Sequence, residues 1–300
     1  MMFKKYTKKP IKTTMYGNKS VSIFEIENDN IDMETVDSFG AEWSKFNNFS
    51  EKEINLAGDQ YFDIVSPDIY SGKSVLDVGC GTGRWSKYLA SKARIIEAID
   101  PSDAVISAAK LLQNEKNIRI SKASVNGIPF PDNSFDFVFS LGVLHHIPDT
   151  QNAMYECVKK VKSGGYFLVY LYYDFDNRGK FYKLLFLASN LIRRVVCILP
   201  STLKKAACDF LALLVYLPII SISKFLLLIG VKKIIKHIPL SYYADKSINI
   251  IRNDSLDRFG TPLEQRYSQK EIYRMMSSCG LNDIIFSKNE PFWHAIGRKK

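Results

Sequence analysis

Two apolar runs that each carry an aspartate near their end are the stretches of this sequence best suited to bind a nucleotide. The first, Ser74–Val78, contains Asp77, and the second is Ile95–Asp100. Three alternating glycines follow the first run directly: Gly79, Gly81 and Gly83. Because glycine has no side chain, its backbone can approach a ligand closely and can adopt positive φ angles. A strand, a glycine turn and a following helix therefore predict a nucleotide cradle.

The glycine spacing discriminates between classes of nucleotide. Gly-x-Gly-x-Gly lacks the glycine that would complete a dinucleotide fingerprint, because Arg84 and Trp85 occupy the next positions. No Gly-Lys-Ser/Thr follows, which excludes a P-loop. Asp100, at the end of the second run, is placed to accept both hydroxyls of an adenosine ribose.

Five patterns follow one another between residues 75 and 165. They are Val75–Gly83, Asp100–Ser102, Gly127–Asp136, Gly142–Asp149 and Val161–Gly165. In this order they resemble the motif series of the class I S-adenosylmethionine (SAM)-dependent methyltransferases. Upstream, Phe39–Trp43 resembles the entry segment of a branch associated with polysaccharide and antibiotic biosynthesis. The resemblance implies SAM as the cofactor and methyl transfer as the reaction.

The resemblance also implies where the methionine and ribose parts of SAM lie. Asp77 and the glycine turn would hold the methionine end, and Asp100 the ribose. Ser102, just after the second run, would contact the cofactor as well. Arg84 either faces the methionine carboxylate or packs in an exposed or sheet-facing position.

The adenine and the methyl group would lie at the ends of two later strands. Ser124 stands where the family often has an aspartate for the adenine amine, and Val125 offers its backbone amide. Ser140 and Leu141 would approach the methyl group by their backbone. The methyl group sits on a sulfonium that leaves as a neutral thioether, so the protein needs only to align the acceptor and remove its proton.

His145 and His146 are the only histidines near the predicted strand ends. An imidazole suits removal of a hydroxyl proton near neutral pH, so one of them is a candidate general base. Either could instead cap the turn after the fourth strand, and the sequence does not choose between the two. His237 and His294 lack neighbours that suggest a metal site, and none is predicted.

Short apolar runs alternate with helix-compatible segments through the core. The runs are Ser74–Val78, Ile95–Asp100, Ile118–Lys122, Phe135–Ser140 and Tyr166–Tyr172. This alternation predicts an α/β fold, with a parallel sheet covered by helices on both faces. Leu281–Ser287 and Trp293–Arg298 would be the sixth and seventh strands, the last antiparallel by resemblance. The expected architecture is a Rossmann-like, seven-stranded, doubly wound sheet with an inserted apolar helical cap.

Composition divides the chain into five parts. Residues 1–38 are polar and basic and predict a flexible arm. Residues 39–73 predict a helical segment that lies over the cofactor site or packs the sheet edge, and residues 74–175 the SAM-binding core. Residues 176–260 predict a basic, apolar helical insertion. Residues 261–300 would complete the sheet with a helix and strands.

The insertion combines positive charge with apolar character. From residue 180 to 236 there are ten Lys or Arg against one acid, Asp209, and Phe210–Ile229 holds fourteen Phe, Leu, Val or Ile in twenty positions. A single membrane crossing would separate the last strands from their sheet, so helices lying in a membrane interface are favoured. The alternative is an apolar cap packed on its own domain in a soluble protein.

The net charge and the cysteine content limit the kinds of partner and the cellular compartment that fit this protein. A net charge of +10 indicates an anionic partner, and the interleaving of basic residues with long aliphatic runs favours an anionic membrane surface over nucleic acid. Five cysteines without a Cys-x-x-Cys pair indicate a reduced chain. The first ten residues lack the apolar core of a secretion signal. The expected location is the cytoplasm, with peripheral attachment to the inner face of the membrane as an option.

The predicted function is methyl transfer from SAM to a hydroxyl of a glycan, a lipid-linked intermediate or another small membrane-associated acceptor. One alternative is transfer to carbon or nitrogen on a prenylated or other lipophilic ring. Another is a non-catalytic, membrane-surface binding protein that retains the fold. Residues 257–267 are either an acceptor-contacting strip or a surface loop. The sequence leaves the oligomeric state open.

Overall fold

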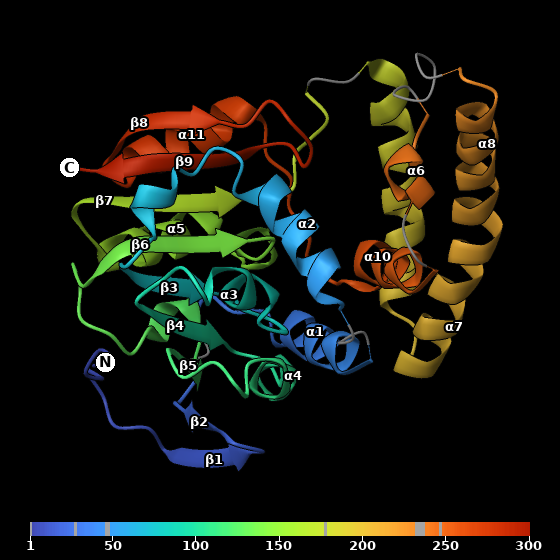
Figure 1. The fold of residues 1–300 in the computed structure, drawn as a ribbon. Coiled ribbons are helices and arrows are strands. Elements are labelled where there is room, and N and C mark those ends of the chain that lie inside the picture. Colours follow the sequence, from blue (N-terminus) through green and yellow to red (C-terminus); the bar gives the residue numbers. More distant parts are fainter. Residues whose placement is uncertain (1, 27–28, 46–48, 177–178, 232–237, 246–247) are drawn as a thin grey trace. The chain divides into compact units, whose positions relative to one another are not determined.

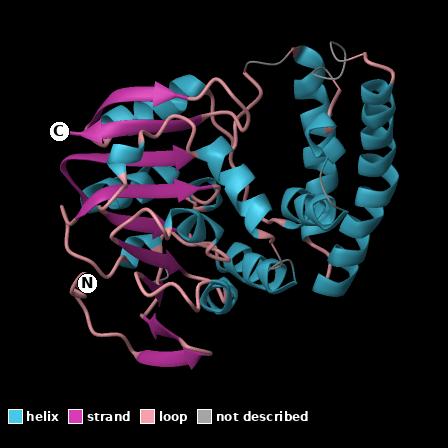
Figure 2. Cartoon of the chain, in the orientation of Figure 1, coloured by secondary structure: helices cyan, strands magenta, loops and turns pink. Residues whose placement is uncertain are grey.

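The computed structural model describes residues 2–26, 29–45, 49–176, 179–231, 238–245 and 248–300. The chain forms two compact units, one of residues 1–179 and 263–300 and the other of residues 180–262. Figure 1 traces both units along the chain, and Figure 2 shows that the strands belong to the first. The second unit overlaps the insertion expected at residues 176–260, and the domain division drawn from the sequence stays a prediction.

The first unit contains one nine-stranded sheet in the order β1-β2-β5-β4-β3-β6-β7-β9-β8. Its strands are β1 (Lys12–Tyr16), β2 (Lys19–Ile23), β3 (Ser74–Val78), β4 (Ile95–Asp100), β5 (Ile118–Lys122), β6 (Phe135–Leu141), β7 (Val161–Tyr170), β8 (Leu281–Phe286) and β9 (His294–Lys299). Strands β2 to β7 pair in parallel, and β9 is antiparallel to both β7 and β8. The predicted α/β class and the antiparallel last strand are confirmed.

The prediction of seven strands is wrong because the first 38 residues are not simply a flexible arm. Lys12–Tyr16 and Lys19–Ile23 form a hairpin, and β2 adds to the sheet beside β5. Gly17 adopts a φ of 60° in the two-residue turn between them. Val21 is fully buried, and Phe24, just after β2, packs against the ring of Tyr6. Burial of these few apolar side chains anchors a segment whose overall composition is polar.

Helices cover both faces of the sheet, as the alternation predicted. They are α1 (Met33–Lys45), α2 (Glu51–Tyr61), α3 (Arg84–Leu89), α4 (Ala104–Leu111), α5 (Thr150–Lys160) and α11 (Gln269–Ser278). Val75 of β3 packs with residues of α2, α3 and α4 on one face. Its neighbour Leu76 packs with residues of α5 and α11 on the other face. Alternation along a strand thus divides the core into two layers.

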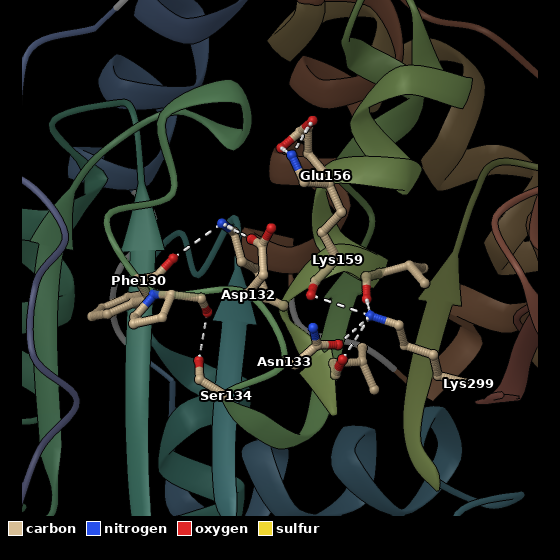
Figure 3. Close-up of polar contacts among 11 residues, drawn as sticks. Phe130, Asp132, Asn133, Ser134, Glu156, Lys159 and Lys299 are labelled. Carbon is tan, nitrogen blue, oxygen red and sulfur yellow. Dashed lines mark hydrogen bonds and ion pairs between the residues drawn. The ribbon is translucent and has the colours of Figure 1, made fainter. Parts of the chain in front are cut away.

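At the amino ends of the parallel strands, here called the amino edge, lysines bond main-chain carbonyls, and Lys299 closes the end of α5 (Figure 3). The ammonium of Lys299 donates to Asn133 Oδ1 and to the carbonyls of Val158, Lys159 and Val161, at 2.8–3.2 Å. These carbonyls lie at the carboxyl terminus of α5, where helical carbonyls lack an intrahelical donor. Lys160 likewise donates to the carbonyl of Phe130 and to Asp132.

The second unit is helical. It contains α6 (Lys180–Cys197), α7 (Ser201–Leu211), a π-helical segment (Ala212–Tyr216), α8 (Leu217–Leu228) and α10 (Ile248–Gly260). One stripe of the α7–α8 helix is buried, including Cys208, Tyr216 and Ser223. The carbonyl of Cys208 accepts a hydrogen bond from Ser255 at 2.7 Å, and Tyr216 donates to Asp254 at 2.8 Å. Helix α10 therefore packs along that stripe.

Candidate functional site

The turn after β3 has the shape that its glycines require. Gly79 adopts a φ of 78°, and a Cβ there would lie 2.4 Å from a methyl group of Val143. Gly83 adopts a φ of 82°, and a Cβ there would lie 2.7 Å from Leu112. Both positions therefore exclude a side chain on steric grounds as well as by backbone conformation. Gly81 has a φ of 52° and lies against the ring of Trp43.

Asp77 is buried beneath this turn. The residue is only 1% exposed. Its Oδ2 accepts a hydrogen bond from the Ser86 hydroxyl at 2.7 Å. Its other oxygen, Oδ1, accepts no hydrogen bond from any described residue. Burial raises the pKa of Asp77 to about 7, and the nearby charge of Asp100 acts in the same direction. A buried carboxylate with one open oxygen is suited to a cationic hydrogen-bond donor.

Asp100 lies at the carboxyl end of β4 and faces the same turn. One oxygen accepts the Gly81 amide at 2.9 Å. The other accepts the Ser102 amide at 2.9 Å and the Ser102 hydroxyl at 2.6 Å. Burial raises the pKa of Asp100, although these hydrogen bonds oppose the shift. Ser102 also accepts the amide of Ala104, so it orients the carboxylate and the start of α4 together.

The residues predicted for the adenine follow β5. Ser124 is buried, and its hydroxyl has no hydrogen-bond partner among the described residues. Val125 is also buried and begins a short 3₁₀ turn, Val125–Gly127. Asn126 in that turn has a buried Oδ1 that accepts no hydrogen bond from the described residues. Open polar atoms therefore continue along this edge from β3 to β5.

Ser140 and Leu141 end β6 beside β3. The Ser140 hydroxyl donates to the carbonyl of Val78 at 2.9 Å and thus ties the two strands together. Leu141 is buried at the end of the strand. The side chain of Ser140 is committed to the sheet, which is compatible with the predicted approach through the backbone. The role of both residues stays a prediction.

The two histidines have different surroundings. The buried His145 ring lies 3.9 Å from the Tyr172 ring centroid and 4.0 Å from that of His146, and neither of its nitrogens bonds a described residue. Burial, reinforced by His146 and Arg266, holds the pKa of His145 well below its usual range. His146 donates from Nδ1 to the carbonyl of Leu263 at 2.7 Å, which leaves the lone pair of the neutral ring on Nε2.

Helix α1 lies across the carboxyl ends of the strands, here called the carboxyl edge. The Phe39 ring is 4.8 Å from the His146 ring. A Cβ on Gly40 would lie 3.6 Å from the Cβ of Ser102, and Trp43 contacts the glycine turn at Gly81. The guanidinium of Arg84 lies 4.5 Å from the Trp85 ring. Phe39 and Trp43 of the segment 39–73 therefore lie at this edge, and a role over the cofactor stays a prediction.

A pair that the sequence did not single out lies in the strip after the insertion. Arg266 Nε donates to Glu264 Oε1 at 2.7 Å, with side chains only 9% and 3% exposed. Leu263–Tyr267 is therefore a partly buried stretch in which these two side chains face inward. Its amide at Gln265 donates to the carbonyl of His145 at 3.0 Å. The sequence signal that could have identified this pair is the presence of Glu264 and Arg266 beside the aromatic Tyr267. Among the described residues, no group of three or more His, Cys, Asp or Glu is placed to hold a metal ion.

Comparison with known proteins gives one family model and a set of partial relatives. Residues 76–169 match the model described as a methyltransferase domain. A ubiquinone biosynthesis O-methyltransferase of Pseudomonas fluorescens is 33% identical over 121 residues, which cover 39% of this chain and 46% of that protein. Phosphoethanolamine N-methyltransferase 2 of Caenorhabditis elegans is 33% identical over 109 residues, covering 35% of this chain and 25% of that protein.

The chain thus spans about half the length, or less, of these curated relatives. Among solved structures, the YcgJ protein of Bacillus subtilis aligns over 80% of this chain and 71% of its own, with 16% identity and a TM-score of 0.47. The family match covers β3 to β7, the strands that carry Asp77, Asp100 and the glycine turn. The first unit of this protein therefore carries a class I methyltransferase domain whose cofactor is SAM.

Proposed function

We propose that this protein transfers the methyl group of SAM to a hydroxyl of a small lipophilic acceptor. The observation that carries the proposal is the open, buried Oδ1 of Asp77 beneath the glycine turn. When bound, SAM supplies a methyl group on a sulfonium, and its methionine end carries an ammonium. That ammonium would occupy the donor position that Asp77 lacks and would hold the carboxylate in its ionised form.

The other residues of the carboxyl edge would hold the remaining parts of the cofactor. Asp100 keeps hydrogen-bonding capacity beyond its bonds to Gly81 and Ser102, because an ionised carboxylate can accept about four hydrogen bonds. It would accept the ribose hydroxyls. Ser124 and the amide of Val125 would hold the adenine. Ser140 and Leu141 would border the methyl group with their backbone.

Removal of the acceptor's proton is proposed for the histidine pair. His145 is neutral at physiological pH because of its burial, so its imidazole can accept a hydrogen bond but binds a proton weakly. The Nδ1 bond of His146 to Leu263 ties the turn after β6 to the strip after the insertion and directs the Nε2 lone pair away from that carbonyl. This geometry supports His146 as the better-oriented base of the two.

A membrane-associated acceptor is proposed from the second unit. One described helix, Thr202–Leu228, is long and apolar enough to cross a membrane by length and composition, and only 22% of its most apolar window is buried. The face opposite the α10 stripe exposes apolar side chains: Phe210, Leu213, Leu214, Ile222, Phe225 and Leu228. A helix of a soluble protein would carry polar residues there.

Charge supports an in-plane location of this helix over a crossing. Lys204 and Lys205 lie near its start, Lys224 lies within its second half, and Asp209 is paired with Arg252 at 2.7 Å. Each basic residue near an anionic surface adds about 1 kcal/mol of attraction. The protein would then meet its acceptor on the cytoplasmic face of a membrane. The polysaccharide or antibiotic branch indicated by residues 39–43 stays a prediction.

The enzymatic proposal is tested by calorimetry with SAM and S-adenosylhomocysteine. Gly81→Arg should abolish binding of both, because its side chain would occupy the turn beside Trp43. Mass spectrometry of lipid and glycan extracts from cells with and without the protein should then show one species that differs by a methylene mass. Absence of SAM binding by the unmodified protein would overturn the proposal and favour the non-catalytic alternative. A product methylated on nitrogen or carbon would overturn its hydroxyl specificity.

Membrane attachment is tested by sedimentation with vesicles of phosphatidylcholine, with and without phosphatidylglycerol. Binding should require the anionic lipid and weaken with salt. Replacing Leu213 and Phe225 by Ser should reduce binding at least tenfold. Leu56→Ser, at an exposed apolar position of α2, is the matched control and should leave binding unchanged. Equal binding of both variants, or none by the unmodified protein, contradicts the membrane proposal.

A further inference from the structure

Two arginine–glutamate pairs in the first unit, each with a buried glutamate side chain, differ in how they satisfy the carboxylate. Arg119 holds Glu97 with two parallel bonds of 2.8 Å, and the amide of Lys4 adds a third at 2.9 Å. Both oxygens of Glu97 are therefore used. Glu264 receives one bond, from Arg266 Nε to Oε1, and its Oε2 is buried without a hydrogen bond from any described residue.

The single bond of Glu264 is a consequence of where Arg266 is held. Its Nη1 donates to the carbonyl of Tyr173 at 3.2 Å, and its guanidinium lies 5.2 Å from the Tyr172 ring and 5.1 Å from the Phe175 ring. These contacts fix the guanidinium plane, so it does not turn its fork onto both carboxylate oxygens. A pair that served stability alone would gain from the bidentate geometry seen at Glu97.

A chain of contacts joins Glu264 to the cofactor turn. Gly79 of that turn abuts Val143, and two residues later His145 accepts the amide of Gln265, the neighbour of Glu264. His145 itself has two buried nitrogens without a described partner. The strip is held against β7 as well, because the amide of Tyr267 donates to the carbonyl of Tyr172 at 2.9 Å. Glu264 therefore lies at the carboxyl edge, beyond β6 and β7.

We infer that Glu264 Oε2 receives the hydroxyl of the methyl acceptor, with Arg266 as the residue that positions the carboxylate. This inference rests on the proposed function and names the acceptor side of the same site. A buried carboxylate oxygen requires a donor. A hydroxyl has a single proton, so in this inference Glu264 accepts the hydrogen bond that the histidine pair would otherwise receive. Arg266 already balances the charge of Glu264, so a neutral hydroxyl fits this position better than an ammonium group.

The chemical class is tested with three small probes that share a ring and a methylene: benzyl alcohol, benzyl methyl ether and benzylamine. Their binding to the full chain saturated with S-adenosylhomocysteine is measured by ligand-observed NMR. Benzyl alcohol should bind at least tenfold more tightly than the ether, which lacks the donor, and than the cationic amine. Phenol and methyl glucoside form further arms that identify an aromatic or a sugar hydroxyl as the source. Equal binding of alcohol and ether, or a preference for the amine, overturns the inference.

The role of Glu264 is tested with Glu264→Gln. In this variant an amide NH₂ group replaces Oε2, so a hydrogen-bond donor faces the hydroxyl donor of the probe. Affinity for S-adenosylhomocysteine should change less than twofold, whereas affinity for benzyl alcohol should fall at least tenfold. Glu97→Gln is the matched control, which should lower the melting temperature and leave both affinities unchanged. If Glu264→Gln fails to fold, Arg266→Lys is the second variant. It should displace the carboxylate and therefore also lower the affinity for benzyl alcohol.

The outcomes separate this inference from the proposed function. Loss of cofactor binding by the unmodified protein removes the proposed function, whatever the probes show. If cofactor binding is retained, and Glu264→Gln and the unmodified protein bind benzyl alcohol with equal affinity, only the inference is contradicted. A histidine readout adds an independent measure, because the ¹⁵N shifts of the His145 ring should move when benzyl alcohol binds and stay unchanged in Glu264→Gln.

Discussion

At the amino edge of the sheet, Lys299, Lys160 and Asp136 direct their polar atoms to neighbouring residues, whereas at the carboxyl edge Asp77 and Glu264 each keep one oxygen without a described partner. Asp136, for example, uses one oxygen for the Ser74 amide and the other for Lys162. Both edges belong to the same strands and are built from the same residue types.

The difference separates groups whose polar atoms are satisfied within the fold from groups that we propose bind a ligand. Buried polar atoms in folded proteins are nearly always hydrogen-bonded, because an unpaired one costs about 1–3 kcal/mol. Most of the open buried atoms among the described residues lie at Asp77 near the carboxyl end of β3, past the carboxyl ends of β5 and β6, or in the strip beside them. That concentration reproduces the general rule that open α/β sheets bind ligands at this edge.

The sharpest test of the comparison is Asp77→Asn. Burial raises the pKa of Asp77 to about 7, above its unfolded value of 3.8, so the folded protein retains the proton in this range. Stability without cofactor should therefore fall as pH rises from 4 to 7, by up to about 4 kcal/mol. The variant should lack this slope, melt at a higher temperature at pH 8 and bind SAM about 30-fold more weakly.

Thermal unfolding between pH 5 and 8 and calorimetry check both effects. In the unmodified protein, SAM binding should release a proton near pH 6, because the ammonium favours ionised Asp77. A variant that binds SAM normally, or that melts with the same pH slope as the unmodified protein, would show that Asp77 is a structural residue.

Two glycines extend the comparison to the backbone. Gly79→Ala at the carboxyl edge adds a Cβ 2.4 Å from Val143 at a φ of 78° and should cost about 3 kcal/mol, with loss of SAM binding. Gly72→Ala, just before β3, has a φ of 68° and no atom within 4 Å of the added Cβ. It should cost about 1 kcal/mol and leave SAM affinity intact. Denaturant unfolding distinguishes the two, and similar losses would contradict the steric argument.

At the amino edge, Lys299→Met should cost about 2 kcal/mol, because three carbonyls and Asn133 lose a charged donor. SAM affinity should stay within twofold of the unmodified protein. Urea denaturation and calorimetry on the same sample make the check. A large change in SAM affinity would mean that the two edges are not independent.

The smallest effect is expected at Asp63, a carboxylate of the first unit in which each oxygen has a hydrogen-bond partner. It accepts hydrogen bonds from Ser287, Asn289 and His294. Burial acts to raise the pKa of Asp63, but these bonds lower it overall. The contribution of Asp63 to the free energy of unfolding should therefore be present above pH 4 and be lost as pH falls further.

Asp63→Asn should accordingly lower stability by about 1 kcal/mol at pH 7 and by less at pH 3. SAM binding should be unchanged, in contrast to Asp77→Asn. Melting curves at the two pH values suffice. An effect on SAM affinity as large as that of Asp77→Asn would remove the distinction between satisfied and open carboxylates.

Local patterns in the sequence predicted the central strands and the glycine turn, because both depend on short-range chemistry. Ser74–Val78 and Ile95–Asp100 have the predicted bounds, and the helix expected within residues 261–300 is α11. The hairpin of β1 and β2 was missed, although Gly17-Asn18 is a two-residue turn signal, because few apolar residues flank it.

Open atoms could not be read from sequence because they depend on long-range packing. Nothing in the neighbourhood of Asp77 indicates that Ser86 uses only one of its oxygens. The pairing of Gln265 with His145 joins segments far apart in the chain, so the environment of Glu264 emerges only in the folded unit. Residue type and spacing identified the edge, and the structure identified which atoms on it lack partners.

The hairpin at the start of the chain also has a consequence for handling the protein. Strand β2 covers the backbone donors and acceptors along the outer side of β5, and β1 in turn covers β2. A truncated version that begins after residue 30 would leave β5 as an uncovered border strand. Such strands recruit other chains by backbone pairing, so the shortened protein should aggregate although every residue of the cofactor site is retained.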